Sequence, residues 1–175
     1  MKLNLILGII VLFLVSCQSG DDSTTNKSGE TDLKLITGME ARASEFGSSI
    51  LLGNPNVFSS HILMYPNPAI GFLNIKGSVD TVITDVWLVE GNPQKTFQSV
   101  DFSKVLNSNL YKETELLSNS TLNFSELSGS NINLNLENVS FGYYKIFIKA
   151  NDEILWGNIY IGNDIDIDDL ISFWN

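Results

Sequence analysis

Residues 143–161 of the 175-residue chain read YYKIFIKANDEILWGNIYI. Before Asn151-Asp152, every second side chain is apolar, and a period of two places alternate side chains on opposite faces of a strand. Asn and Asp favour tight turns, because both tolerate the backbone angles that a two-residue turn needs. The stretch therefore predicts two long antiparallel strands joined by a hairpin. One face of the first strand would carry Tyr144, Ile146 and Ile148.

Shorter stretches elsewhere carry similar strand signals. Residues 131–138 (NINLNLEN) alternate strictly, and residues 81–90 (TVITDVWLVE) are rich in β-branched and aromatic side chains. Residues 72–76 form another short strand, and residues 94–102 are expected to pair with 81–90. A short helix is expected at residues 38–46. Repeated short strands between Gly, Asn and Pro turns predict an all-β, antiparallel β-sandwich.

The N-terminus carries the pattern of a secretory signal. Lys2 precedes an apolar run at residues 5–15. As a helix this run would be roughly 16 Å long, against about 30 Å for the hydrocarbon core of a bilayer. It is therefore too short to cross a membrane and is typical of a signal peptide.

The signal ends in Leu14-Val15-Ser16-Cys17, which contains the only cysteine of the chain. The pattern resembles the lipobox of bacterial lipoproteins. That resemblance implies cleavage between Ser16 and Cys17, alkylation of the thiol by diacylglycerol and acylation of the new amine. A thiolate is a suitable nucleophile, and several acyl chains anchor more firmly than one. The alternative is a plain signal peptide with a chance cysteine.

The residues behind Cys17 predict a tether. Residues 18–32 contain no large apolar side chain, so they cannot repay the entropic cost of ordering. We expect a flexible linker with a mean reach of about 20 Å. Asp21 and Asp22 resemble the acidic surface-export signal of lipoproteins in the Bacteroidota, which implies a lipid-anchored outer-membrane protein facing outward. The alternative is the ordinary acidity of a linker.

The body of the chain carries a family pattern. Residues 65–68 read Tyr-Pro-Asn-Pro, and a strand follows at 72–75. Gly91 ends the middle strand, and a Gly-Tyr-Tyr sequence opens the long hairpin at Gly142. In this order the pieces resemble the C-terminal sorting domain of type IX secretion, over residues 62–162. The resemblance implies an immunoglobulin-like sandwich of about seven strands, in which these residues are structural: Tyr65, Pro66, Asn67, Pro68, Gly91, Gly142 and Tyr144.

The expected organisation has five parts, and it departs from the family in the middle segment and at the C-terminal end. Residues 98–130 are longer than the family's middle segment and are expected to form an inserted loop or hairpin. The C-terminal part is acidic and is expected to end in a short helix packed on the body. In order, the parts are a signal peptide (1–16), the lipidated Cys17 with its tether (17–32), a lead-in segment (33–61), the β-sandwich (62–162) and the C-terminal extension (163–175).

Composition excludes several classes of function. The chain has 10 basic and 20 acidic residues, and removal of residues 1–16 leaves a net charge of −11, which argues against nucleic-acid binding. His61 is the only histidine, so we predict no catalytic residue. The acidic run at 164–169 lacks the glycine and distant glutamate of a calcium loop, so we predict no metal site and no cofactor.

The leading hypothesis is a non-enzymatic, lipid-anchored envelope lipoprotein of the outer membrane. Its partners would be the membrane, through the lipid, and an envelope or secretion protein, through the sandwich edges or residues 98–130. One alternative is a type IX secretion substrate or accessory component. Another is a glycan-binding surface lipoprotein, which would need an exposed aromatic platform from Trp87, Trp156 or Trp174; core packing is the default for Trp87 and Trp156.

Overall fold

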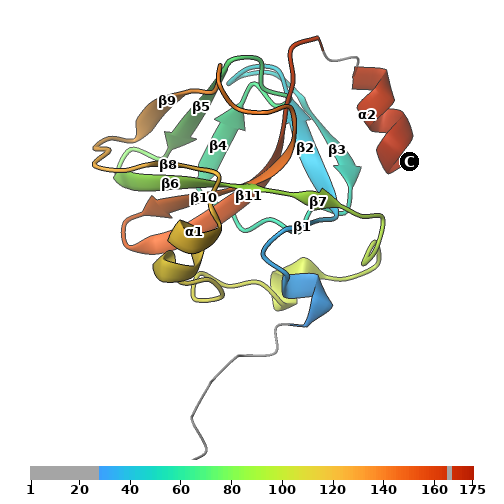
Figure 1. Ribbon diagram of the computed structural model, residues 1–175, viewed down its shortest axis with the longest axis horizontal. Helices are drawn as coiled ribbons and strands as arrows, with labels where there is room; N and C mark the ends of the chain where they lie inside the picture. Colours follow the sequence, from blue (N-terminus) through green and yellow to red (C-terminus); the bar gives the residue numbers. More distant parts are fainter. Residues whose placement is uncertain (1–27, 165–166) are drawn as a thin grey trace, which may run out of the picture.

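The computed structural model of the protein describes residues 28–164 and 167–175 and consists mostly of antiparallel β-strands with two α-helices (Figure 1). The predicted β-rich fold is confirmed. In chain order the elements are the 3₁₀ turn Gly29–Thr31, β1 (Leu35–Ile36), β2 (Gly38–Arg42), β3 (Ser49–Gly53), β4 (Ile62–Tyr65), β5 (Phe72–Gly77), β6 (Ile83–Glu90), β7 (Asn92–Pro93), the 3₁₀ turn Phe102–Lys104, α1 (Glu113–Asn119), β8 (Leu122–Phe124), β9 (Asn131–Asn135), β10 (Gly142–Ala150), β11 (Glu153–Ile161) and α2 (Ile167–Trp174).

The largest sheet has the strand order β11-β10-β6-β8, and all its pairs are antiparallel. Strands β10 and β11 pair from Gly142 opposite Ile161 to Ala150 opposite Glu153. The turn residues Asn151 and Asp152 both have positive φ, 49° and 67°, as a two-residue hairpin turn requires. The predicted long hairpin is therefore confirmed.

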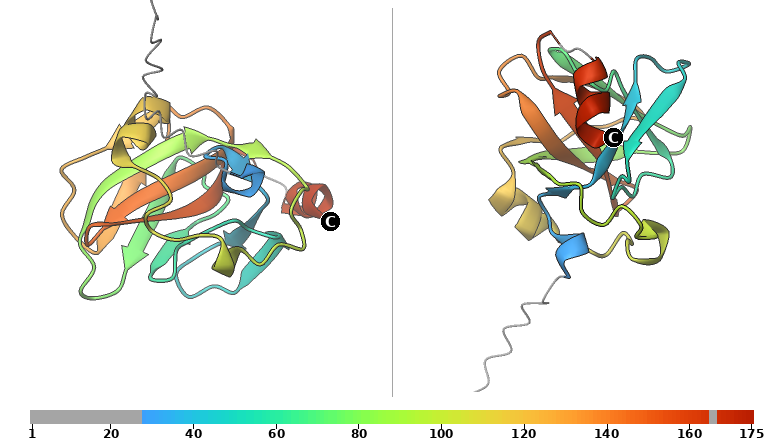
Figure 2. Two further views of the ribbon diagram at one scale, coloured as in Figure 1. Left: turned by 90° about the horizontal axis from the view of Figure 1, so that it is seen from below. Right: turned by 90° about the vertical axis from the view of Figure 1, so that its right-hand side faces the viewer.

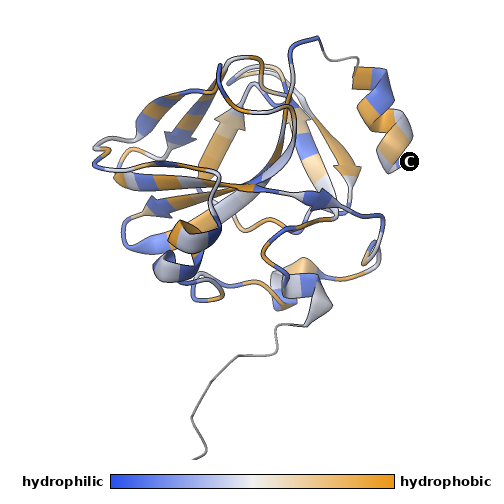
Figure 3. Ribbon diagram, in the orientation of Figure 1, coloured by the Kyte–Doolittle hydropathy of each residue, from blue (hydrophilic) through white to orange (hydrophobic). Residues whose placement is uncertain are grey.

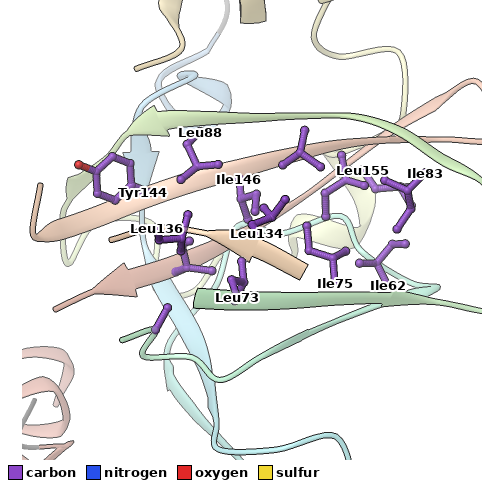
Figure 4. Close-up of a cluster of buried hydrophobic side chains, with 14 of the residues drawn as sticks. Ile62, Leu73, Ile75, Ile83, Leu88, Leu134, Leu136, Tyr144, Ile146 and Leu155 are labelled. Carbon is purple, nitrogen blue, oxygen red and sulfur yellow. The ribbon is translucent and has the colours of Figure 1, made fainter. Parts of the chain in front are cut away.

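A second antiparallel sheet, in the order β4-β5-β9, faces the first across a shared core (Figure 4). Leu73 and Leu134 lie opposite each other on β5 and β9 and point toward Ile146 on β10. The alternation that predicted these strands is visible as stripes along β5 and β9 in Figure 3. Each such buried aliphatic side chain stabilises the fold by about 1.5–3 kcal/mol relative to an exposed one.

The outer face of the four-stranded sheet is covered by residues 97–119. Trp87, Phe147 and Trp156 project from that face into a second apolar cluster. Their partners come from the covering segment and include Phe102, Leu106, Tyr111 and Leu116. In the segment 98–130, expected as an inserted loop or hairpin, the first part covers this face with four buried side chains and the second part supplies β8.

The expected helix at residues 38–46 is wrong, because residues 38–42 form β2 and pair with β3. Met-Glu-Ala-Arg favours a helix by intrinsic propensity, but tertiary pairing overrides that preference. A side chain at Gly38 would collide with the backbone of Leu52 on β3. Arg42 also pairs with Asn67 through two backbone hydrogen bonds of 2.7 and 2.8 Å, which an α-helix could not make.

The expected pairing of residues 94–102 with residues 81–90 is also wrong. After β7, which pairs in parallel with β1, the chain turns away at Phe97, whose φ is 59°. The free edge of β6 is taken by β8 instead. The sequence between 94 and 102 thus leads from the sheet into the covering segment.

Both ends of the described chain pack on the body. Thr31 is buried, and its carbonyl accepts a hydrogen bond of 3.0 Å from the Tyr111 hydroxyl. The folded body therefore includes residues 28–32, the last part of the predicted tether. The lead-in segment 33–61 supplies β1, β2 and β3. At the other end, the predicted C-terminal helix is confirmed as α2, whose Leu170 and Trp174 are buried against β2 and β3.

Candidate binding groove

The predicted lipidation site, Cys17, lies outside the described residues, as do Ser16 and the acidic pair Asp21 and Asp22. Cleavage, lipid attachment and surface export therefore stay predictions. The other predicted site residues lie in the folded body, and they are described below in the places where the structure puts them.

The Tyr65-Pro66-Asn67-Pro68 motif joins β2 to β11. Asn67 is 3% exposed. Its side-chain amide donates to the carbonyls of Glu40 (2.7 Å) and Asn158 (3.0 Å), and its side-chain oxygen accepts from the N–H of Tyr160 (3.1 Å). Together with the two backbone bonds to Arg42, these contacts give every N–H group of Asn67 an acceptor and each of its two oxygens one donor. The motif thus connects β2 and β11, which belong to different sheets and are not paired with each other.

Two further buried asparagines extend this polar network. Asn158 donates to the carbonyl of Gly38 (2.8 Å) and to the side-chain oxygen of Asn56 (2.9 Å). Asn56 in turn donates to the carbonyl of Leu35 (2.9 Å), and its own carbonyl accepts from the indole N–H of Trp156 (3.0 Å). Sequence reasoning missed Asn56 and Asn158, since asparagine is usually exposed and this chain contains many.

A small, partly open cavity of about 30 Å³ borders the network, and both Arg42 and Asn158 line it. The Nε of Arg42 and the Oδ1 of Asn158 are buried without a hydrogen-bond partner among the described residues. One atom is a donor and the other an acceptor. The cavity has the size and the polar lining that suit a single buried water.

A larger, open groove of about 350 Å³ lies next to the motif, between the β2–β3 hairpin and the start of α2. Pro66 and Pro68 form one wall, so the two prolines of the predicted motif are also surface residues of the groove. The lining is mostly apolar. It consists of Ala41, Arg42, Ala43, Ser48, Ile50, Pro66, Asn67, Pro68 and Ile167.

Strand β3 forms the outer border of this groove and is an edge strand, since β2 is its only strand neighbour in the described chain. Ser49 is exposed, Ile50 is 49% exposed and Leu51 is 67% exposed. No Lys, Arg, Asp or Glu occurs between residues 46 and 60. This edge therefore lacks the charges and prolines that usually protect a free strand.

The charges around the groove are mostly negative or already paired. The Arg42 guanidinium donates to Glu40 (2.8 Å) and to the Gly47 carbonyl (2.6 Å). Glu45 pairs with Lys76, and this hydrogen bond holds the pKa of the carboxyl below its usual value. Ile167 belongs to an acidic stretch, because residues 163–175 contain no basic side chain. Asp164, Asp168 and Asp169 of this stretch are exposed, and Asp164 and Asp169 line a separate pocket beside Phe141 and Tyr160.

The remaining motif residues shape strand ends. A side chain at Gly91 would collide with Ile36, so glycine permits the close approach of β1. Gly142 opens β10 with a φ of 147°, which favours glycine. The Tyr144 hydroxyl donates to the carbonyl of Ser140 (2.9 Å), and burial raises the pKa of that phenol. None of these residues lines the groove.

Other predicted features do not form a site in the described part of the chain. Trp87, Trp156 and Trp174 are all buried, so they present no aromatic platform to a glycan. His61 is exposed in the turn before β4. Residues 28–164 and 167–175 contain no cluster of three or more potential metal ligands. Within the same residues, no helix has the length and apolarity needed to span a membrane.

Comparison of the chain with protein families, curated proteins and solved structures found no match.

Proposed function

We propose that this chain is a non-enzymatic lipoprotein of the bacterial envelope, anchored by lipid at Cys17, whose folded body binds another protein. The observation that carries the proposal is Leu14-Val15-Ser16-Cys17 at the end of a short apolar run. The expected location is the outer membrane, and Asp21 and Asp22 favour its outer face. We infer the protein-binding role from the apolar groove and the exposed β3 edge.

The arrangement of the body supports this proposal. The chain enters the described fold at residues 28–31, drawn in blue at the bottom of Figure 1. The β2–β3 turn and the start of α2 lie at the opposite end, and the second view in Figure 2 agrees. An anchor attached through the N-terminal segment would therefore present the groove away from the bilayer.

We also propose that the two facing sheets belong to the immunoglobulin-like class. The hydroxyl of Tyr144, near the start of β10, bonds a carbonyl four residues upstream, as in the tyrosine corner of that class. The β1–β3 segment, the covering segment 97–119 and α2 would then be additions around the sandwich. Solution of the structure by crystallography would test this assignment through the strand connectivity.

A type IX secretion role is the second candidate, and the Tyr65–Pro68 motif favours it. Asn67 depends on partners in β2, which lies outside residues 62–162. A secretion test should therefore fuse residues 28–175 to a reporter with a signal peptide. Export in a competent host, and its loss in a strain without the secretion machinery, would support this candidate; retention where a known sorting domain is exported would contradict it.

The anchor is tested by replacing Cys17 with Ala in the full-length chain. Metabolic labelling with a fatty acid, membrane fractionation and intact mass of the product are the measurements. We expect loss of the label and of the lipid mass, while Ser16→Ala, the matched control, keeps both. A labelled, processed Cys17→Ala protein would contradict the proposal.

Surface exposure is tested separately. Protease treatment of intact cells should degrade the wild-type protein, and replacement of Asp21 and Asp22 by Asn should protect it. Equal degradation of both proteins would show that the two acids are not an export signal.

A further inference from the structure

We propose that the β3 edge and the adjoining groove bind an extended, positively charged segment of another protein, which adds to the sheet as a further strand. The inference rests on the proposed protein-binding role and names its surface and its kind of partner. Three properties of the described residues carry it: the free backbone groups of β3, the apolar groove beside them, and the sign of the surrounding charge.

The backbone pattern leaves outward-facing groups on β3. The N–H and C=O of Arg42 bond Asn67, so Arg42 and the residue opposite it, Ser49, form a pair without hydrogen bonds between them. Such pairs alternate with bonded pairs along an antiparallel ladder, which makes Leu51 opposite Glu40 the next one. The N–H and C=O of Ser49 and Leu51 therefore point away from β2, toward the free edge. No hydrogen bond to them is made by the described residues.

The side chains of β3 determine which positions of an added strand would contact the groove and so select its sequence. Ile50 lines the groove, while Leu51 lies on the opposite face of the strand. In strand addition, main-chain hydrogen bonds supply affinity and pockets for alternate side chains supply selectivity. The groove beside Ile50 and Ile167 would take an apolar side chain, and the next side chain of the partner would point to solvent.

The charge distribution decides between a second copy of this chain and another protein. Pairing of two copies through β3 would bring together two surfaces whose exposed charges are acidic, with a net charge of −10 for each whole chain. Like charges across an interface oppose association, whereas a partner of opposite sign is favoured and steered toward the site. The excess of 20 acidic over 10 basic residues in the chain therefore favours lysine or arginine at the solvent-facing positions of the partner.

The test uses the mature chain with Cys17 replaced by Ser, which retains every folded residue. The probe is a capped nine-residue peptide of alternating valine and lysine, labelled for fluorescence anisotropy. The matched peptide carries glutamate in place of lysine. We expect saturable binding of the lysine peptide, no binding of the glutamate peptide, and amide NMR shifts concentrated on residues 49–53.

Two variants localise the binding. Leu51→Pro removes an outward N–H without removing a bond to β2, and Leu51→Lys adds a charge to the edge that repels the probe. Each should weaken binding at least about tenfold, which corresponds to about 1.4 kcal/mol. Val79→Ser, which removes an exposed apolar side chain from the loop between β5 and β6, should leave binding unchanged. Circular dichroism checks that each variant is folded.

Several results would overturn the inference: equal affinity for the two peptides, shifts located away from β3, or unchanged binding to a folded Leu51→Lys variant. A concentration-dependent dimer in analytical ultracentrifugation, lost in Leu51→Lys, would also overturn it and assign the edge to a second copy. These outcomes are independent of the anchor, because lipid labelling of Cys17 does not depend on residue 51.

Discussion

Two regions that add to the pair of facing sheets behave in opposite ways in this fold. Residues 97–119 bury Phe102, Leu106, Tyr111 and Leu116 on the outer face of the four-stranded sheet. The β2–β3 hairpin buries only its inner side chains and leaves Ile50 and Leu51 exposed. The first region completes the core, and the second leaves a strand edge open. The first region lies against aromatic side chains of the sheet. In the second, one face packs on the body and α2, while the outer edge of β3 has no strand neighbour among the described residues.

The largest loss of stability is expected for substitutions where residues 97–119 pack on the four-stranded sheet. Leu116→Ala should lower the free energy of unfolding by about 3 kcal/mol, because it leaves a cavity in a packed cluster. Leu117→Ala is the matched control, since its side chain lies on the same helix and is half exposed. Urea denaturation measures both. Equal losses for the two variants would mean that α1 does not cover the sheet as described.

A somewhat smaller loss of stability is expected when the polar connection between the β2–β3 hairpin and the body is removed. Asn67→Ala should cost about 2–3 kcal/mol, because it leaves the buried carbonyls and N–H that Asn67 bonds without partners. Asn133→Ala, which breaks an exposed side-chain bond to Asn74, is the control and should cost far less. Hydrogen exchange should show that β2 and β3 open first in Asn67→Ala. Unchanged protection of β2 would contradict the connecting role.

Tyr111→Phe should cost roughly 1 kcal/mol at pH 7 through loss of the hydrogen bond to Thr31. It should also change the alkaline stability. Burial, with smaller contributions from Glu115 and Asp32, raises the pKa of the phenol above its ordinary value of 10.0. Above pH 10 the unfolded chain therefore ionises first, and the wild-type protein loses stability as the pH rises. The variant should lose less; identical slopes in urea titrations between pH 9 and 11 would contradict this.

The smallest change in stability is expected for substitutions at the free edge of β3. Leu51→Ser should change the free energy of unfolding by no more than about 0.5 kcal/mol, since most of this side chain is already in water. Leu52→Ser, one residue along on the buried face, should be strongly destabilising. Thermal unfolding of the pair measures the contrast. A large loss for Leu51→Ser would show that the edge is covered in solution.

The sequence predicts the parts of this fold that depend on local pattern. The period of two at residues 143–161 predicts the β10–β11 hairpin with its turn, and the C-terminal helix predicted within 163–175 is α2. The helix predicted from residue 38 is wrong, because residues 38–42 pair with β3 and Arg42 also pairs with Asn67, 25 positions away in the chain. Long-range pairing of this kind leaves no local signal.

The candidate site was only partly predictable for the same reason. The prolines of the Tyr65–Pro68 motif were recognised as structural, but the groove they border also needs Ile50 and Ile167, which come from distant segments. The buried asparagines could not be separated from the many exposed ones, since their burial depends on the position of β11. Lipid attachment at Cys17 stays a prediction from the lipobox pattern.

The uncharged β3 edge has a consequence for the colloidal behaviour of the protein. The acidic residues keep separate molecules apart at neutral pH, and the isoelectric point is near 4.3. In mildly acidic buffer this repulsion disappears while the edge keeps its unpaired N–H and C=O groups. We expect the purified body to be soluble at pH 7.5 and to precipitate near pH 4, with less precipitation when a lysine replaces Leu51.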